Sequence, residues 1–195
     1  MYKMTSSFRT LDSILNTIHE MFTDRGYKII PRSQWNKKNQ QFEDLKAIAN
    51  MQDGTIVFVF FDTEPKVLVK KIREYVAHME EQKITNAVLV YGTQITSGAK
   101  SGIPENYKFE TFQATELYKN RTRHYLVPKH EKLTDEQIAE VLKKYCVSSK
   151  NQLPRYDPSD MVVRYYNWPV GTVVKIYRRF GNQREPEDYY RHVRP

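Results

Sequence analysis

The stretch "TIVFVFFDTEPKVLVKKIREYVAHMEEQKITNAVLVYG", residues 55–92, decides the fold class of this chain. Residues 55–61 and 86–92 are rich in β-branched and aromatic or aliphatic side chains, which is typical of buried strands. Between them lies a helical pattern that Pro65 can open at its first position. Two strands joined by a helix predict a βαβ unit with a parallel strand pair. The predicted apolar face of the helix is Leu68, Ile72, Tyr75, Val76 and Met79.

The sequence on either side extends this α/β pattern. Residues 8–27 place apolar side chains at helical spacing, and Gly26 suits the C′ position that ends a helix. The remaining elements of this half are expected to be a polar segment with a turn at Asp53-Gly54 (31–54), a loop (93–106), a third strand (108–112) and a short helix or turn (114–120).

A second unit is predicted to begin near residues 120–128, because Pro128 interrupts any regular element. Thr134 begins a strongly specified helix, since Gln137 completes a capping box and Leu133 and Ile138 occupy the positions of a hydrophobic staple. The predicted buried face of this helix is Ile138, Val141, Leu142 and Tyr145. The later elements are expected to be a helix capped by Asp160 (161–167), a strand (172–178) and its hairpin partner (188–193).

Composition limits the function classes. The net charge of +8 and the pI near 9.4 favour a polyanionic partner, or a basic protein without a specific nucleic-acid site. The single cysteine, Cys146, excludes a disulfide framework or a Cys-rich zinc site within the chain, and it is expected to be a small buried hydrophobe. No apolar run reaches the length of a membrane span and no secretory signal is visible, so we expect no membrane partner and a reducing compartment.

The histidines do not predict a metal centre. His124 and His130 lie six positions apart across a proline, and no carboxylate or cysteine set nearby completes a site. A positioning or interface role suits His130 better. His19 and His78 are expected to pack or to lie on the surface, and His192 lies in a basic tail.

Two nucleic-acid chemistries are open at the level of residues. Glu64-Pro65-Lys66, with Asp53 or Asp62 upstream, imitates the Glu-x-Lys of metal-dependent nucleases. The central proline argues against a strand that carries both side chains.

The loop at residues 92–102 lacks the spacing of a phosphate-binding loop, although Lys100 could touch a nucleic-acid phosphate. A basic and aromatic run could bind an anion or form a solvated strand edge; it comprises Lys175, Tyr177, Arg178, Arg179, Phe180 and Arg184. Residue chemistry alone therefore predicts a binding or scaffold protein without a cofactor.

Several motifs together resemble a known family. "LVPKH" (126–130), "NQLPR" (151–155) and "GTVVKIYR" (171–178) are similar to the C-terminal assembly domain of the fifth subunit of eukaryotic-type DNA-directed RNA polymerases, which also has a shorter archaeal equivalent. The N-terminal half resembles the jaw domain of the same eukaryotic subunit, through "MFTDRGY" (21–27), "DTEPKV" (62–67), "LVYGTQIT" (89–96) and "FETFQATEL" (109–117).

The resemblance implies a non-catalytic polymerase subunit without a cofactor or metal. The implied fold is an α/β jaw domain (1–120), restriction-endonuclease-like and inactive, and a small α+β assembly domain (121–195) with a mainly β sheet flanked by helices. Implied partners are the largest subunit, other polymerase subunits, downstream duplex DNA bound weakly without sequence specificity, and transcription factors. The implied location is the nucleus, or a viral particle or cytoplasmic viral factory if a virus encodes the chain. A metal-dependent nuclease using Glu64 and Lys66, and a free transcription regulator of the same shape, are the alternatives.

The resemblance also implies sites. The DNA-proximal loop would be Thr96, Ser97, Gly98, Ala99 and Lys100. Leu126 and Val127 are expected to pack, and Pro128 to make the entry into the assembly domain rigid. The interface with the largest subunit would be Lys129, His130, Gln152, Leu153, Pro154, Arg155, Lys175 and Arg178.

The chain departs from the family pattern at several positions. Thr96-Ser97-Gly98-Ala99 stand where Thr-Pro-Ser-Ala is usual, which predicts a more flexible loop. Met161 replaces a usual proline and Asn167 a usual glycine. "RFGNQREPEDYYRHV" (179–193) replaces the expected Ser-Glu-Thr segment, so the final hairpin contact is expected to be reshaped in a divergent lineage. The residues that still align are Lys175, Arg178, Tyr190 and Arg191.

Overall fold

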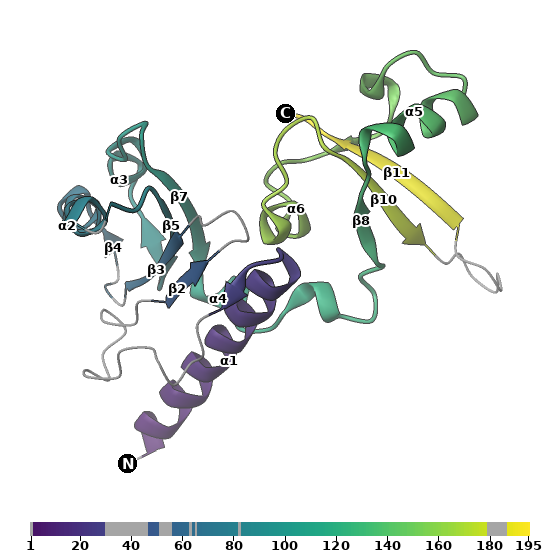
Figure 1. Ribbon diagram of the computed structural model, residues 1–195. Coiled ribbons are helices and arrows are strands. Elements are labelled where there is room, and N and C mark those ends of the chain that lie inside the picture. The colour runs from purple at the N-terminus through teal and green to yellow at the C-terminus, as the bar shows by residue number, and fades with distance from the viewer. Residues whose placement is uncertain are drawn as a thin grey trace. The chain divides into compact units, whose positions relative to one another are not determined.

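The computed structural model divides into two compact units, residues 1–119 and 120–195, which are described separately (Figure 1). The part of the chain that the structure describes comprises residues 2–29, 47–50, 56–62, 64, 66–81, 83–178 and 187–195. The turn expected at Asp53-Gly54 lies outside these residues.

A five-stranded sheet forms the centre of the first unit, in the order β1-β2-β3-β5-β7. The strands β3 (Ile56–Asp62), β5 (Asn86–Tyr91) and β7 (Lys108–Gln113) run parallel, which confirms the predicted parallel pair and the third strand. β1 (Lys28–Ile29) and β2 (Ala47–Asn50) extend the sheet in antiparallel pairing. The polar sequence around β2 had not predicted this extension.

The helix α2 (Val69–Glu81) begins later than the sequence predicts. Residues Lys66–Val67 form a short strand, β4, which pairs with β6 (Gln94–Ile95). Leu68 then precedes the helix, and its carbonyl accepts from the backbone N–H groups of Lys71 and Ile72. Its side chain is 52% exposed, so the prediction that Leu68 joins the buried face is wrong.

Each face of the first sheet carries its own apolar layer, and Figure 1 shows α2 and α3 (Ser97–Ser101) on one side and α1 (Tyr2–Asp24) on the other. On the α2 side, the ring of Phe60 stacks on Tyr75 with centroids 4.5 Å apart. On the other side, the guanidinium of Arg25 meets the carboxylate of Glu110 on β7 at 2.6 Å. Other buried members of these layers are Phe58, Ile72, Met79, Leu89, Val59, Val88, Ile14, Ile18 and Met21.

The end of α1 confirms the predicted glycine stop. Gly26 has a φ of +81°, a conformation that glycine adopts without the penalty of a Cβ. Its N–H donates to Thr23, and the N–H of Tyr27 donates to Phe22, each over 2.9 Å. These bonds form a Schellman motif, and the rings of Phe22 and Tyr27 supply its apolar contact at 5.1 Å.

The second unit is built on a four-stranded sheet in the order β8-β10-β11-β9. β10 and β11 pair antiparallel, which confirms the predicted hairpin, and β9 joins β11 in parallel. The elements of this unit are η3 (Arg121–Arg123), β8 (His130–Lys132), α5 (Asp135–Lys144), η4 (Lys150–Gln152), β9 (Arg155–Tyr156), α6 (Met161–Tyr166), β10 (Val173–Arg178) and β11 (Glu187–Val193).

Alternation along β10 and β11 gives this sheet two apolar faces. The face toward α6 gathers Tyr156, Val162, Val163, Val174, Ile176 and Val193. The face toward α5 gathers Leu133, Val141, Leu153, Val173 and Tyr190. A helix on each face therefore completes an α+β unit around a mainly β sheet.

The start of α5 confirms the predicted capping box. The hydroxyl of Thr134 accepts from the N–H of Gln137 at 3.4 Å, and the Gln137 amide oxygen accepts from the N–H of Thr134 at 2.9 Å. Leu133 is buried, and Ile138 packs in the same apolar cluster, as a hydrophobic staple requires.

The end of α5 corrects one prediction and qualifies another. Tyr145 follows the last helical turn and is 47% exposed as a residue, although its ring packs edge-to-face on the core residue Tyr190 with centroids 5.8 Å apart. Cys146 adopts a φ of +53° and is exposed, because it occupies the left-handed position of a Schellman motif. The N–H of Val147 donates to Leu142 in that motif.

The predicted cap of α6 is confirmed, because the carboxylate of Asp160 accepts from the N–H of Val162 at 2.8 Å. The helix ends at Asn167 with a φ of +51°. Asparagine tolerates this left-handed conformation better than most residues, so it can replace the glycine of the family pattern.

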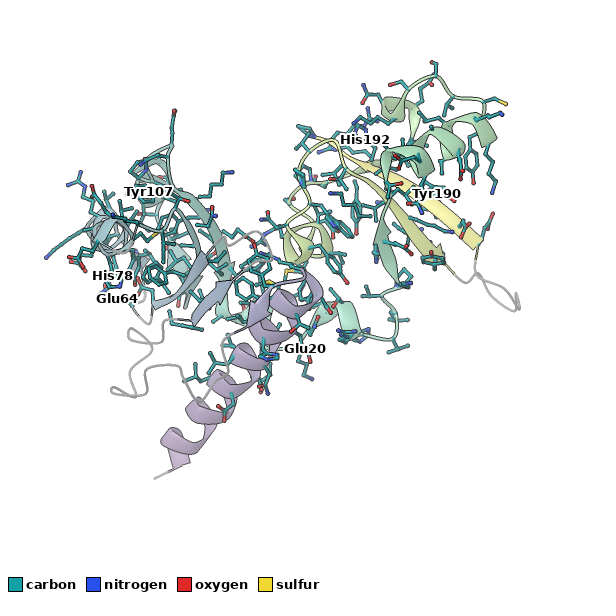
Figure 2. All side chains as sticks on the ribbon, viewed as in Figure 1. Glu20, Glu64, His78, Tyr107, Tyr190 and His192 are labelled. Atoms are coloured by element: carbon teal, nitrogen blue, oxygen red, sulfur yellow. The ribbon has the colours of Figure 1, made fainter. Side chains whose placement is uncertain are left out.

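His192 is buried within the second unit rather than exposed in a tail (Figure 2). Its side chain is 3% exposed, and within the described part of the chain neither ring nitrogen has a hydrogen-bond partner. Burial, with smaller effects of Lys150 and Arg194, lowers the pKa of His192 below its ordinary value of 6.5. The folded unit therefore favours the neutral imidazole.

Replacing Thr134 tests the importance of the α5 cap. We expect Thr134→Ala to lower the opening free energy of the α5 amides by about 1 kcal/mol, because one helix N–H loses its acceptor. Native-state hydrogen exchange on the full chain measures this quantity. Thr134→Ser retains the hydroxyl and should behave like the original chain; equal protection in Thr134→Ala would show that the cap does not hold the helix start.

Replacing His192 tests the effect of its burial. Because the folded state lowers the pKa of His192, the unfolded chain binds the proton more strongly. The free energy of unfolding that depends on a neutral His192 is therefore complete above pH 6.5 and is lost as the pH falls below it. We expect His192→Leu to reduce the loss of β11 amide protection between about pH 7.5 and about pH 5.5, after correction for intrinsic exchange. His19→Gln, at an exposed position of the first unit, serves as control. An unchanged pH dependence in His192→Leu would contradict the assignment.

Candidate functional site

The residues that resemble a nuclease motif are not arranged as a nuclease site. Asp62, at the end of β3, is buried, and its carboxylate accepts from the N–H of Glu64 at 2.9 Å and from the hydroxyl of Tyr75 at 3.2 Å. Glu64 (Figure 2) and Lys66 are exposed, and Lys66 lies on β4 rather than on β3. Among the described residues no three potential ligands gather around a metal position, and Asp53 lies outside them.

The segment Thr96–Lys100 is a helical turn rather than a flexible loop. α3 spans Ser97–Ser101, and the hydroxyl of Thr96 caps it by accepting from the N–H of Ala99 at 3.2 Å. Ala99 is fully buried, so this residue cannot contact DNA directly. The exposed members of the segment are Ser97, Gly98 and Lys100.

The chain enters the second unit through a turn that exposes Leu126. The N–H of Val127 donates to the carbonyl of His124 at 2.8 Å, which places Tyr125 and Leu126 at the corner. Their side chains are 86% and 70% exposed. The packing expected for Leu126 is therefore wrong, whereas Val127 does pack against the apolar cluster on the α6 side.

His130 is a positioning residue in this structure. Its Nδ1 lies 2.7 Å from the carbonyl oxygen of Pro128, and its Nε2 lies 3.2 Å from the hydroxyl of Tyr156. Donation from Nδ1 leaves Nε2 to accept from the phenol. Burial is the main cause that lowers the pKa of His130, so the ring is held neutral between these partners. Lys129, beside it, is exposed.

The interface candidates at residues 152–155 lie at the β9 edge of the sheet. Gln152 caps the preceding turn by accepting from the N–H of Ser148 at 2.8 Å. Leu153 is buried in the α5-side core, whereas Pro154 and Arg155 are exposed. The Arg155 guanidinium forms an ion pair with Asp157 at 3.1 Å. Leu153 therefore serves the core, and its neighbours face solvent.

Two lysines at the end of the α5-side face of the sheet each form an ion pair. The amine of Lys175 meets Asp188 at 3.0 Å, and that of Lys129 meets Glu131 at 3.6 Å. Both amines also lie over the ring of Tyr177, at 4.6 Å and 5.2 Å from its centroid. The hydrogen bond with Asp188 raises the pKa of Lys175, so this cation is stabilised within the chain.

The α6-side face carries a stack of arginine and aromatic groups that sequence reasoning missed. The Arg178 guanidinium lies 4.7 Å from the ring centroid of Tyr189. That of Arg191 lies 5.4 Å from Tyr189 and 5.5 Å from Tyr156. The rings of Tyr156 and His130 stack at 6.0 Å. We name these five residues the arginine–tyrosine stack. The alternation Tyr189-x-Arg191 beside Arg178 was its only signal in the sequence.

Comparison with known proteins agrees with this architecture. The family model described as RNA polymerase Rpb5, C-terminal domain, matches residues 119–193. The chain is 36% identical to the RPABC1 subunit of DNA-directed RNA polymerases I, II and III from Caenorhabditis briggsae, over 86% of this chain and 77% of the relative. It is 36% identical to the rpabc1 subunit from Dictyostelium discoideum, over 85% and 88%. It is 40% identical to subunit 5A of DNA-directed RNA polymerase V from Arabidopsis thaliana, over 82% and 78%.

A solved restriction endonuclease, MspJI bound to an oligonucleotide, aligns with a TM-score of 0.39 and 18% identity over 59% of this chain and 27% of the endonuclease. This likeness is too low to establish a shared fold. The relatives, in contrast, match both units over most of their own length. The chain therefore belongs to the RPABC1 (Rpb5) family of DNA-directed RNA polymerase subunits.

Proposed function

We propose that this chain is a non-catalytic subunit that anchors on the largest subunit of a nuclear DNA-directed RNA polymerase through its second unit. One observation carries the proposal: the match to the Rpb5 C-terminal domain, residues 119–193, coincides with the second compact unit. The interface would include Lys129, His130, Gln152, Pro154, Arg155, Lys175 and Arg178.

The first unit would then act as a jaw beside downstream duplex DNA. Support comes from Lys100, which is exposed on α3 next to Ser97 and Gly98. Because Thr96 caps this turn and Ala99 anchors it in the core, a lysine here would approach a phosphate from a fixed position. One such contact gives weak binding without sequence specificity.

The two alternatives have less support. A nuclease would need Glu64 and Lys66 on one strand face, but Glu64 lies between β3 and β4 and Lys66 begins β4. A free regulator would need the same folded units without stable assembly, and the similarity to named polymerase subunits over both units favours assembly. Among the described residues no helix has the length and apolar character to cross a membrane.

Capture of the polymerase from native extract tests the proposed assembly. A tagged full chain should recover the two largest polymerase subunits in equal molar amount, as measured by quantitative mass spectrometry, and should retain them in high salt. Recovery far below one polymerase per chain would favour the regulator. Loss of assembly together with Mg²⁺-dependent DNA cleavage that Glu64→Ala abolishes would favour the nuclease.

Replacing Lys100 tests the proposed DNA contact. We expect Lys100→Glu to weaken binding of duplex DNA by the full chain. Binding should also release about one counterion fewer, so the slope of log affinity against log salt concentration should be shallower. Fluorescence anisotropy at several salt concentrations measures both quantities. Lys70→Glu, at an exposed position of α2, makes the same charge change elsewhere. Equal losses in the two variants would indicate a general charge effect rather than a contact at α3.

A further inference from the structure

The cations on the two faces of the second sheet differ in whether the chain itself provides a carboxylate partner. On the α5 side, Lys175 and Lys129 are each paired with a carboxylate of the chain itself. On the α6 side, Arg178 and Arg191 form no ion pair with any residue that the structure describes. The Nε of Arg191 is buried and has no hydrogen-bond partner among these residues. The Nη groups of both guanidiniums are not among the buried unpaired atoms, so these are the donors open to an external acceptor.

Strand register holds the two arginines on one face. β10 pairs with β11 so that Val174 lies opposite Arg191, Ile176 opposite Tyr189, and Arg178 opposite Glu187. Tyr189 therefore lies between the two guanidinium groups along the strand. Both arginines are partly buried, and the Arg191 guanidinium lies 5.5 Å and 5.4 Å from the ring centroids of Tyr156 and Tyr189. The stack fixes their orientation before any partner binds.

The geometry favours a carboxylate over a nucleic acid. Single-stranded nucleic acids bind by stacking bases on aromatic rings. Here arginines of the same chain lie over the Tyr189 and Tyr156 rings. The Nη donors, which are not among the buried unpaired atoms, match a carboxylate in bidentate geometry. Partly buried, preorganised arginines of this kind suit a protein interface.

We propose that Arg178 and Arg191, held by the arginine–tyrosine stack, bind aspartate or glutamate side chains of an acidic segment in a partner polymerase subunit. This inference rests on the proposed function and adds the chemistry of the partner. It assigns the main recognition to the α6-side face, and it adds Arg191, Tyr189 and Tyr156 to the interface.

A paired capture experiment tests the role of the two arginines in assembly. The full tagged chain is compared with Arg178→Gln/Arg191→Gln and with the control Lys143→Gln/Lys144→Gln, which removes the same charge from the exposed end of α5. We expect the arginine variant to recover at least about tenfold less largest subunit, because it loses two charge-assisted contacts. Recovery equal to that of the control would overturn the proposal. Hydrogen exchange of the β10 and β11 amides checks that the variant is folded.

If that variant loses its fold, Arg178→Lys/Arg191→Lys provides the test, because it keeps the charge and adds a reactive amine at each position. In captured complexes, a carbodiimide should join these amines to carboxylates of a polymerase subunit by zero-length amide bonds that mass spectrometry locates. Absence of such bonds in an intact complex, or formaldehyde cross-links to nucleic acid at these positions instead, would overturn the proposal.

A titration of the purified chain separates this inference from the proposed function. Poly-L-glutamate should shift the side-chain Nε–Hε NMR signals of Arg178 and Arg191, whereas an oligodeoxynucleotide of equal charge should leave them nearly unchanged. Such a result, with no polymerase captured from extract, would refute the proposed assembly but retain the carboxylate site. The reverse preference would refute the carboxylate site even if the chain assembles.

Discussion

The pairing of β10 with β11 is the constraint on which the functional surface of the second unit depends. Side chains alternate along a strand, so the register decides which residues reach each face. In the observed register, apolar residues in the middle of each strand pack under α5 and α6, and the charged residues near the hairpin remain at the end of the sheet. A register shift by one residue would bury Lys175 and transfer Arg178 to the opposite face. Because burial of the apolar residues selects the observed register, it also determines the face on which each cation lies.

Elements with a local cause could be predicted from the sequence. The capping box at Thr134, the glycine stop at Gly26 and the cap at Asp160 each depend on a few neighbouring residues, and the structure contains all three. The parallel strands could also be predicted because their residues are almost continuously apolar, and the final hairpin because two runs rich in β-branched and aromatic residues lie close together in the sequence. Some errors arose at local turns, as at Cys146 and Leu126, and another arose where a distant segment decides the outcome. β4 displaces the start of α2 only because β6, far along the chain, pairs with it.

The candidate site was less predictable, mainly because contacts between strands determine it. Sequence alone suggested which residues are basic, but it could not show that Lys175 and Lys129 are neutralised by Asp188 and Glu131. It expected Leu126 to pack, whereas a turn exposes it. Arg191 and Tyr189 gain their significance from contacts across strands, which require the register. The family resemblance supplied the function, and the structure distinguished core residues such as Leu153 from exposed ones.

The end of α5 has a practical consequence for experiments on the assembled protein. Cys146 is the only cysteine of the chain, and its exposed thiol stands on a backbone turn that hydrogen bonds fix. A maleimide dye or spin label could therefore be attached at one defined point without engineering the rest of the sequence. Because the Schellman motif anchors that point to a helix of the second unit, the label would follow the unit as a body rather than a loose loop. The chain carries its own reporter for following incorporation into a larger assembly in real time.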